Sequence, residues 1–487
     1  MAIFKTVGAD AKRADKITRF LIRSVLAAAG LLFFCLNSFA QKNESAAALE
    51  SAARLLSAQI AEKPQNLPGL FDKNFFHRIS LEKLSDILSG IYKSNGRVTA
   101  VRLERADSAF SAHFIFETEN NFELPAALSL DPDTGKISGV FFTTAYKKNL
   151  LLQEFKEKLV RLEGKTGFIL RRFGVPSPTG GAEGELAGVN ENGYFAVGSA
   201  FKLYVLGALL EKGVRWKTIV HLREEQKSLP GGRPSATTAL ADKLPAGDVW
   251  RAPKADGPAG GLAGWPDASP LTAHTLSVMM ISESDNTAAD LLIETIGRKT
   301  LEGYLQKFGH SNPALMRPFL KTSEMFRLKS DTESVLKYLN LPPGDKYGFL
   351  SELAAAPLKA EAVKKSSFGI DKIEWMASPA DLCRLMEYIY KKDDKQALDI
   401  LAMSPPPVGL RLTGGGVNTG LDMETGNFFY AGYKGGSEPG VLNMTWLLKS
   451  KSNAWYCLSA SWNNEKKNLD ENKFFELVQS VLRAGWE

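Results

Sequence analysis

Histidine and cysteine are scarce in this 487-residue sequence, which contains 5 His and 3 Cys. No G-x-S-x-G segment is present, and a Ser-His-Asp hydrolase is therefore poorly supported. Neither H-x-H-x-D nor H-E-x-x-H occurs, which argues against a zinc hydrolase. We expect no cofactor, and we interpret the scattered histidines as ordinary surface or core side chains: His77, His113, His221, His274 and His310.

A strong excess of charge of one sign is also lacking over most of the chain. The formal net charge is +6, but six basic and two acidic residues before Ser24 supply +4 of it. No basic stripe with interleaved aromatic residues follows, so we expect no nucleic-acid partner. Hydrophobic residues make up 44% and charged residues 23%, as in globular proteins, and the length suggests two or three domains.

The apolar stretch near the N-terminus is too short to span a bilayer comfortably. Ser24–Leu36 has about 13 residues, follows the basic start and precedes a small-residue cleavage site, Ser38-x-Ala40. This pattern predicts a signal peptide over residues 1–40 and a periplasmic or secreted bacterial protein without a stable membrane anchor after cleavage. An uncleaved anchor is the alternative, and two phenylalanines before Cys35 argue against lipidation there.

Two cysteines remain once the signal peptide is removed. Cys383 falls in a helical pattern and Cys457 in a strand-like run, and no C-x-x-C pair exists. We interpret both as buried small hydrophobic side chains. A single disulfide between them is the alternative, since exported proteins form such bonds.

The first part of the mature chain, residues 41–148, predicts a small α+β domain. Helical spacing covers residues 44–62 and Leu81–Tyr92, the latter entered through Ser80. Asp131–Gly135 is a hairpin turn signal. Four strand-like segments follow the helices: Val98–Leu103, Phe110–Phe116, Phe122–Leu130 and Ile137–Phe142.

The second part, residues 149–487, predicts a larger α+β domain in which an antiparallel sheet is flanked by helices. Leu229–Pro270 is rich in Gly, Pro, Ala and Asp and is interpreted as a long irregular connection that borders a site. Predicted helices are Leu150–Glu163, Thr272–Ile281, a helix from Met376 to about Lys391, and Glu471–Leu482. Predicted strands are Gly167–Phe173, Phe428–Gly435, Val441–Lys449 and Trp455–Trp462.

Ser199-x-x-Lys202 lies where a small-residue turn runs into an apolar helical pattern. Side chains three positions apart on a helix are neighbours, so the lysine ammonium lies close to the serine hydroxyl. A lysine that loses solvation reaches its neutral form more easily and can then take the serine proton. An N-cap serine with a solvated lysine is the alternative, but Lys202 interrupts an apolar run, which disfavours a solvated position.

Two further polar clusters follow in order, Ser284-Asp285-Asn286 at a helix start and Lys434-Gly435-Gly436-Ser437 at a strand end. This order resembles the serine penicillin-recognising enzymes, the class A β-lactamases and DD-peptidases, whose motifs are Ser-x-x-Lys, Ser-Asp-Asn and Lys-Thr-Gly. The resemblance covers roughly residues 165–487. It implies a serine hydrolase with a β-lactamase/DD-peptidase-like fold, acting on a small-molecule substrate such as a β-lactam, an ester or a peptidoglycan-like compound.

The resemblance also implies a role for each matching residue. Ser199 would be acylated, Lys202 would act as base or proton relay, and Ser284 would pass a proton to the departing lactam nitrogen. The substrate side would be formed by Asn286, Lys434, Gly436 and Ser437. Asn286 would hold the substrate amide, Lys434 would attract its carboxylate, and the N–H groups of Ser199 and Ser437 would form an oxyanion hole. In the alternative interpretation these polar residues only cap a helix and the glycines only mark a strand end.

Two positions depart from the family pattern. Gly435 stands where the family has threonine or serine, so a hydroxyl that grips the substrate carboxylate is missing, and Ser437 is a candidate substitute. Class A enzymes also need a glutamate that activates the deacylating water. Glu324 is the best candidate, with an exposed helix glutamate as the alternative. Without such a glutamate, the protein would trap β-lactams.

The phrases around Ser199 and Lys434 further resemble secreted two-domain hydrolases related to the β-lactamase-like protein of the clavulanic acid pathway. That resemblance implies a steroid-isomerase-like cone as the N-terminal domain. The alternatives in function are a DD-peptidase or penicillin-binding esterase that uses the same serine, and a non-catalytic cell-wall or small-molecule binding protein with a residual serine site.

Overall fold

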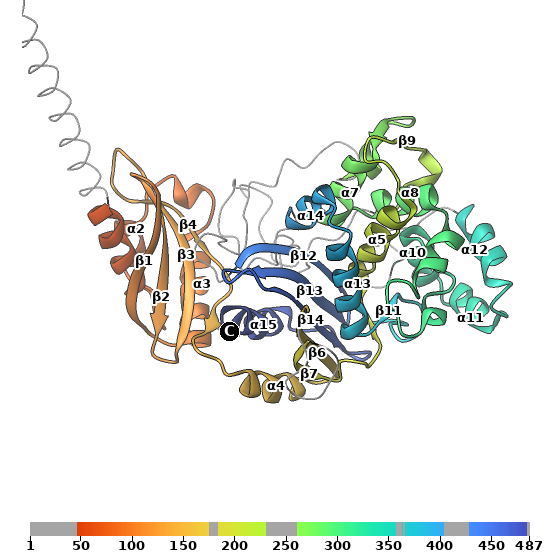
Figure 1. Cartoon of the computed structure of the whole chain (residues 1–487). Helices are drawn as coiled ribbons and strands as arrows, with labels where there is room; N and C mark the ends of the chain where they lie inside the picture. The colour runs from red at the N-terminus through yellow and green to blue at the C-terminus, as the bar shows by residue number, and fades with distance from the viewer. Residues whose placement is uncertain are drawn as a thin grey trace, which may run out of the picture. The chain divides into compact units, whose positions relative to one another are not determined.

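The computed structural model describes residues 46–174, 184–229, 261–356, 363, 366–403 and 428–484. Contacts divide the chain into two compact units. One is the chain up to Asn120 with Pro125–Phe141, and the other is Asn121–Leu124 with Phe142–Glu487 (Figure 1). The predicted signal peptide and most of the predicted connection Leu229–Pro270 lie outside the described residues.

The first unit combines helices with a sheet whose first two strands pair antiparallel. Residues 46–57 are helical, α2 spans Leu67–Leu70 and α3 spans Leu81–Asn95. Ser80 caps α3 as predicted, because its Oγ accepts a hydrogen bond from Lys83 N. The strands are β1 (Val98–Ser108), β2 (Ser111–Thr118), β3 (Phe122–Leu130) and β4 (Ile137–Phe142), in that order across the sheet. Strand β5 (Tyr146–Lys147), which the contacts assign to the second unit, pairs with the start of β3.

A five-stranded antiparallel sheet organises the second unit, in the order β12-β13-β14-β6-β7. Alternate residues face opposite sides, so Phe168 and Leu170 enter one apolar core and Ile169 enters the other. Among the described strands, β12 has a sheet neighbour on one side only, so its other edge can border a site. The strands are β6 (Lys165–Arg172), β7 (Glu185–Val189), β12 (Phe428–Glu438), β13 (Val441–Ser450) and β14 (Trp455–Asn463).

Helices cover both faces of this sheet (Figure 1). Helices α4 (Leu152–Val160) and α15 (Glu471–Arg483) pack their apolar side chains on one face, and α13 (Pro379–Lys391) packs on the other. The predicted antiparallel sheet flanked by helices is therefore confirmed. Further helices extend the α13 side: α5 (Lys202–Lys212), α7 (Ala273–Ser282), α8 (Asn286–Ile296), α9 (Arg298–Tyr304), α10 (Thr322–Ser330), α11 (Thr332–Asn340), α12 (Lys346–Ala354) and α14 (Lys395–Ala402). Within the described residues, no helix combines the length and apolar character needed to cross a membrane.

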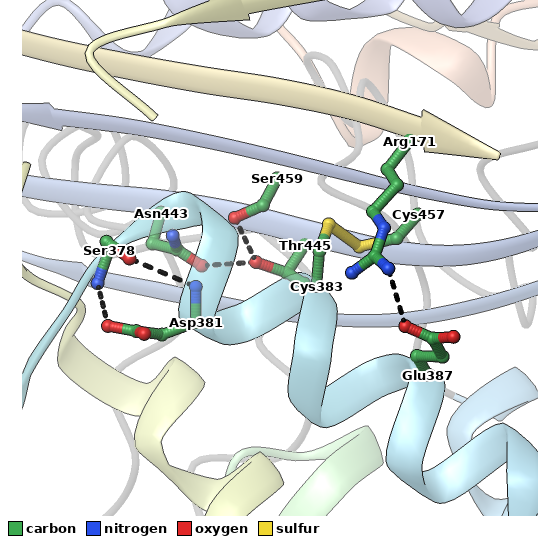
Figure 2. The surroundings of a disulfide bond; sticks show 9 residues. All are labelled: Arg171, Ser378, Asp381, Cys383, Glu387, Asn443, Thr445, Cys457 and Ser459. Carbon is green, nitrogen blue, oxygen red and sulfur yellow. Dashed lines mark hydrogen bonds and ion pairs between the residues drawn. A yellow bond between two sulfur atoms is a disulfide. The ribbon is translucent and has the colours of Figure 1, made fainter. Parts of the chain in front are cut away.

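A disulfide joins Cys383 of α13 to Cys457 of β14 (Figure 2). The structure therefore corrects our preferred interpretation of two separate buried thiols and supports its alternative. Both residues are fully buried, as expected, but α13 packs directly on the sheet and brings together residues that are 74 positions apart. The bond fastens a helix of one core to the central part of the sheet.

We predict that the Cys383→Ala/Cys457→Ala double variant loses about 3–4 kcal/mol of unfolding free energy, because a crosslink over a long loop restricts the unfolded chain. Urea unfolding of the variant and of the wild type measures this loss. The wild type in reductant serves as control and should unfold like the variant. Equal urea midpoints for the oxidised wild type and the variant would contradict the prediction.

Candidate active site

The first motif lies in a 3-10 turn, η2 (Gly198–Phe201), that continues into helix α5. Ser199 is half-buried, whereas Lys202 is 0% exposed. Lys202 Nζ lies 3.1 Å from Ser199 Oγ, as the spacing predicts. The solvated-lysine alternative is therefore wrong, and Ser199 has a potential base within hydrogen-bond distance.

Four oxygen atoms surround the Lys202 ammonium. Besides Ser199 Oγ, it contacts Ser284 O at 2.6 Å, Ser284 Oγ at 3.1 Å and Asn286 Oδ1 at 2.7 Å. Burial lowers the pKa of Lys202 to about 7, against the attraction of Asp285 and Asp290. At neutral pH a large fraction of Lys202 is therefore neutral and able to accept a proton.

The second motif supplies most of these oxygen atoms from the start of α8. Asp285 caps the helix, with its Oδ1 2.7 Å from Ala288 N, while Ser284 adopts a left-handed backbone with φ 56°. Few serines adopt this conformation, and here it accompanies contacts of both Ser284 oxygens with Lys202. Asn286 does not cap the helix. It accepts from Lys202, and its Nδ2 donates to Leu229 O at 3.1 Å.

The third motif brings a second buried lysine to the same serine. Lys434 Nζ lies 3.1 Å from Ser284 Oγ and 2.7 Å from the Gly435 carbonyl. Burial, together with the positive charge of Lys202, holds the pKa of Lys434 well below its ordinary value. Ser284 Oγ therefore bridges two amines and can pass a proton between either of them and a bound substrate.

The edge of β12 runs so close to η2, the turn that carries Ser199, that only glycine fits at the two points of closest approach. A Cβ at Gly436 would lie 2.0 Å from Val197 O and 2.6 Å from Ser199 N. A Cβ at Gly198, which has φ 48°, would lie 3.3 Å from Ser437 N. The amide nitrogens of Ser199 and Ser437 thus lie on adjacent backbones, as an oxyanion hole requires.

Gly435 and Ser437 lie on the opposite face of β12. The contacts of Ser437 do not support its predicted role as a substitute for the hydroxyl that is missing at Gly435. Ser437 Oγ donates to Glu471 Oε1 at 2.6 Å, so this hydroxyl is already engaged. A Cβ at Gly435 would lie only 2.1 Å from Tyr433 Oη. The tyrosine hydroxyl therefore occupies the space into which a threonine at position 435 would project.

Glu324 does not contact the serine and lysine side chains of the site. One oxygen pairs with Arg298, and the other accepts from Lys321 N at 2.9 Å at the start of α10. The side chain is buried, so the alternative of an exposed glutamate is wrong. These contacts are those of a structural ion pair, and a role of Glu324 in deacylation stays a prediction.

Several residues that sequence reasoning missed support the site from behind. Asp290 accepts hydrogen bonds from Thr322 N at 2.6 Å and Ser323 N at 2.9 Å, which ties α10 to α8. Thr322 Oγ1 also lies 2.8 Å from Ser228 Oγ and 3.2 Å from Asn286 O. Asp290 follows the second motif by one helical turn on a buried face of α8. This spacing is the sequence signal from which its supporting role could have been predicted.

The comparisons with known proteins agree with this geometry. A family model described as the beta-lactamase enzyme family matches residues 154–406, more than half of the chain. The chain belongs to this family, whose members are serine hydrolases that work through an acyl-enzyme. Among curated proteins, none matches the chain. The narrower two-domain branch is not covered by the family match.

Solved structures show similarity to the same part of the chain. The β-lactamase of Sphaerobacter thermophilus is 16% identical with a TM-score of 0.41, covering 68% of this chain and 94% of that one. A β-lactamase of Francisella tularensis is 14% identical with a TM-score of 0.39, covering 68% and 96%. The protein PBP-A is 16% identical with a TM-score of 0.39, covering 68% and 92%. Because these values are low, the family assignment rests on the family match alone.

We predict that acylation of Ser199 accelerates as pH rises and reaches half its maximum near pH 7. Below the lowered pKa, Lys202 is protonated and cannot accept the serine proton, whereas above it the neutral amine can. The measurement is the second-order acylation rate against pH. Lys202→Arg is the control, because guanidinium stays charged; it should lose about 10²–10⁴-fold in rate and the pH step with it. A wild-type profile that is flat across neutral pH would contradict this assignment.

Proposed function

We propose that the protein is a secreted serine hydrolase that forms an acyl-enzyme at Ser199 with β-lactam, ester or amide substrates and deacylates slowly. The observation that carries the proposal is the buried Lys202 ammonium, which lies 3.1 Å from both Ser199 Oγ and Ser284 Oγ. This position places one amine within hydrogen-bond distance of both hydroxyls, so that it can exchange a proton with either of them.

Acylation then proceeds in two steps. Neutral Lys202 takes the Ser199 proton while Ser199 Oγ attacks the substrate carbonyl, and the N–H groups of Ser199 and Ser437 stabilise the oxyanion. When the carbonyl–nitrogen bond of a β-lactam breaks, the nitrogen takes a proton from Ser284 Oγ. Ser284 recovers a proton from the Lys202 ammonium, which restores neutral Lys202 and leaves Ser199 as an ester.

Slow deacylation is inferred from what surrounds that ester. Within the described part of the chain, no carboxylate forms a hydrogen bond with Ser199, Lys202 or Ser284. The oxygens of Glu324 and Asp290 are bound by Arg298 and by α10 backbone groups. None of these carboxylates is therefore free to accept a proton from a water that attacks the ester.

We also propose export to the periplasm or medium and membership of the two-domain branch that resembles the clavulanic acid pathway protein. The Cys383–Cys457 disulfide supports export, because such bonds persist in oxidising compartments. The sheet of β1 to β5 with its helices supports a cone-like first domain. Intact mass of the exported protein tests the first point, with an N-terminus at Gln41 expected and an uncut chain contradicting it. An experimental structure with an open, flat sheet would contradict the second.

We predict that a fluorescent penicillin labels the mature protein covalently and that Ser199→Ala abolishes the label. The alanine variant lacks only the attacking oxygen, so a folded sample with unchanged melting temperature isolates the chemistry. Gel fluorescence and intact mass measure the adduct. No adduct on folded wild type would overturn the penicillin-recognising function and favour a binding protein with a residual site.

We predict that Glu324→Gln lowers the melting temperature but leaves the lifetime of the penicilloyl-enzyme unchanged. Glutamine can keep the contact with Lys321 N but leaves Arg298 without its counter-charge. Loss of the adduct mass over time gives the lifetime, and chromogenic cephalosporin gives turnover. A longer lifetime with unchanged acylation would instead make Glu324 the deacylating base.

Hydrolysis of a D-alanyl ester without cephalosporin turnover would favour the DD-peptidase alternative.

A further inference from the structure

A third buried lysine, which belongs to none of the three motifs, lies between two glutamates. Lys329 of α10 pairs with Glu374 and lies 2.5 Å from Glu438 Oε2 at the end of β12. The exposed fractions of the three side chains are 7%, 0% and 16% in that order. We refer to Lys329, Glu374 and Glu438 as the α10 cluster.

One glutamate of the α10 cluster is linked to the backbone that carries the nucleophile. Glu374 precedes Trp375, whose carbonyl accepts from Val197 N at 3.0 Å, two residues before Ser199. The next residues form β11 (Met376–Ala377), which pairs with β8 (Phe195–Ala196). The Trp375 ring also stacks on Phe201 of η2 at 3.8 Å. Glu374 therefore lies one residue from a backbone segment that is bonded to, and stacked on, the turn that carries the Ser199 amide.

The other glutamate is linked to the second oxyanion donor. Glu438 follows Ser437 directly and points to the same strand face as Lys434 and Gly436. Because β12 is an edge strand, its outer edge near Ser437 is held by contacts other than a neighbouring strand of the sheet. The contact of Glu438 with Lys329 is one of them.

The arrangement is costly as a source of stability alone. Burial and the neighbouring Glu438 raise the pKa of Glu374, and Glu374 Oε2 has no hydrogen-bond partner among the described residues. Although burial opposes it, the attraction of both glutamates raises the pKa of Lys329. Buried ion pairs often contribute little net stability, and some are retained because they fix one arrangement of the chain.

We propose that Lys329 is a positioning residue of the oxyanion hole: its ammonium joins Glu374 to Glu438 and so fixes the spacing between the Ser199 and Ser437 amides. This inference rests on the proposed acylation of Ser199. Lys329 does not touch the substrate in this account. It acts through the two backbone segments that carry the amide donors.

The test measures the limiting acylation rate and the apparent substrate affinity separately, by stopped-flow with a fluorescent penicillin. Lys329→Met should lower the limiting rate about 10²-fold per folded molecule, because a displacement of about 1 Å at reacting groups has this effect. The apparent affinity should change little, and Lys329→Arg should restore part of the rate.

Glu438→Gln provides a variant that remains testable if Lys329→Met does not fold. It keeps the shape of a side chain that is only partly buried, and it should lower the limiting rate in the same direction. Glu387→Gln is its matched control, because Glu387 of α13 is 14% exposed and pairs with Arg171 of β6 at 3.0 Å (Figure 2). Two strands, β13 and β14, separate β6 from β12 in the sheet. The control should change the melting temperature without changing the rate.

The outcomes separate the two claims. An unlabelled wild type would overturn the proposed function itself. A labelled wild type, with Glu438→Gln and every folded Lys329 variant acylated at the wild-type rate, would overturn the positioning role and leave the α10 cluster as a purely structural ion pair.

Discussion

The buried ammonium of Lys202 is the interaction on which the rest of the site depends. It contacts oxygen atoms from its own helix turn and from the start of α8, and none of these atoms belongs to a carboxylate. Burial makes the neutral form of this lysine accessible near pH 7, and the attraction of Asp285 and Asp290, neither of which it contacts, only partly opposes the effect. The left-handed backbone of Ser284 and the inward-facing Asn286 both serve this placement.

Lys434 brings a second buried amine to the site from strand β12 of the sheet. This second buried amine contacts Ser284 Oγ, and burial together with the charge of Lys202 lowers its pKa, so that it provides another route for a proton. The close approach of Gly436 to the nucleophile turn then places two backbone amides beside Ser199. The described residues therefore hold the groups that the proposed acylation needs, and no carboxylate among them forms a hydrogen bond with Ser199, Lys202 or Ser284.

Much of the fold follows from local sequence. The strands Phe122–Leu130 and Ile137–Phe142 and the Ser80 cap have the predicted positions, because alternation and capping are local properties. The three motifs converge as their order indicated. The Cys383–Cys457 bond was predicted only as an alternative, and the Arg298 partner of Glu324 and the contact of Ser437 with Glu471 were not predicted. Each joins segments that only the packed fold brings together, and a buried glutamate has no sequence pattern of its own.

The central claim is that Lys202 titrates near neutrality inside the folded enzyme. Direct NMR titration of enzyme labelled at the lysine ε-carbon tests it, with the Lys202 signal assigned by its loss in Lys202→Arg. We predict a Lys202 midpoint at about 7. A midpoint at the ordinary lysine value of about 10.4 would contradict the account, because Lys202 would then be charged at neutral pH and unable to accept the Ser199 proton.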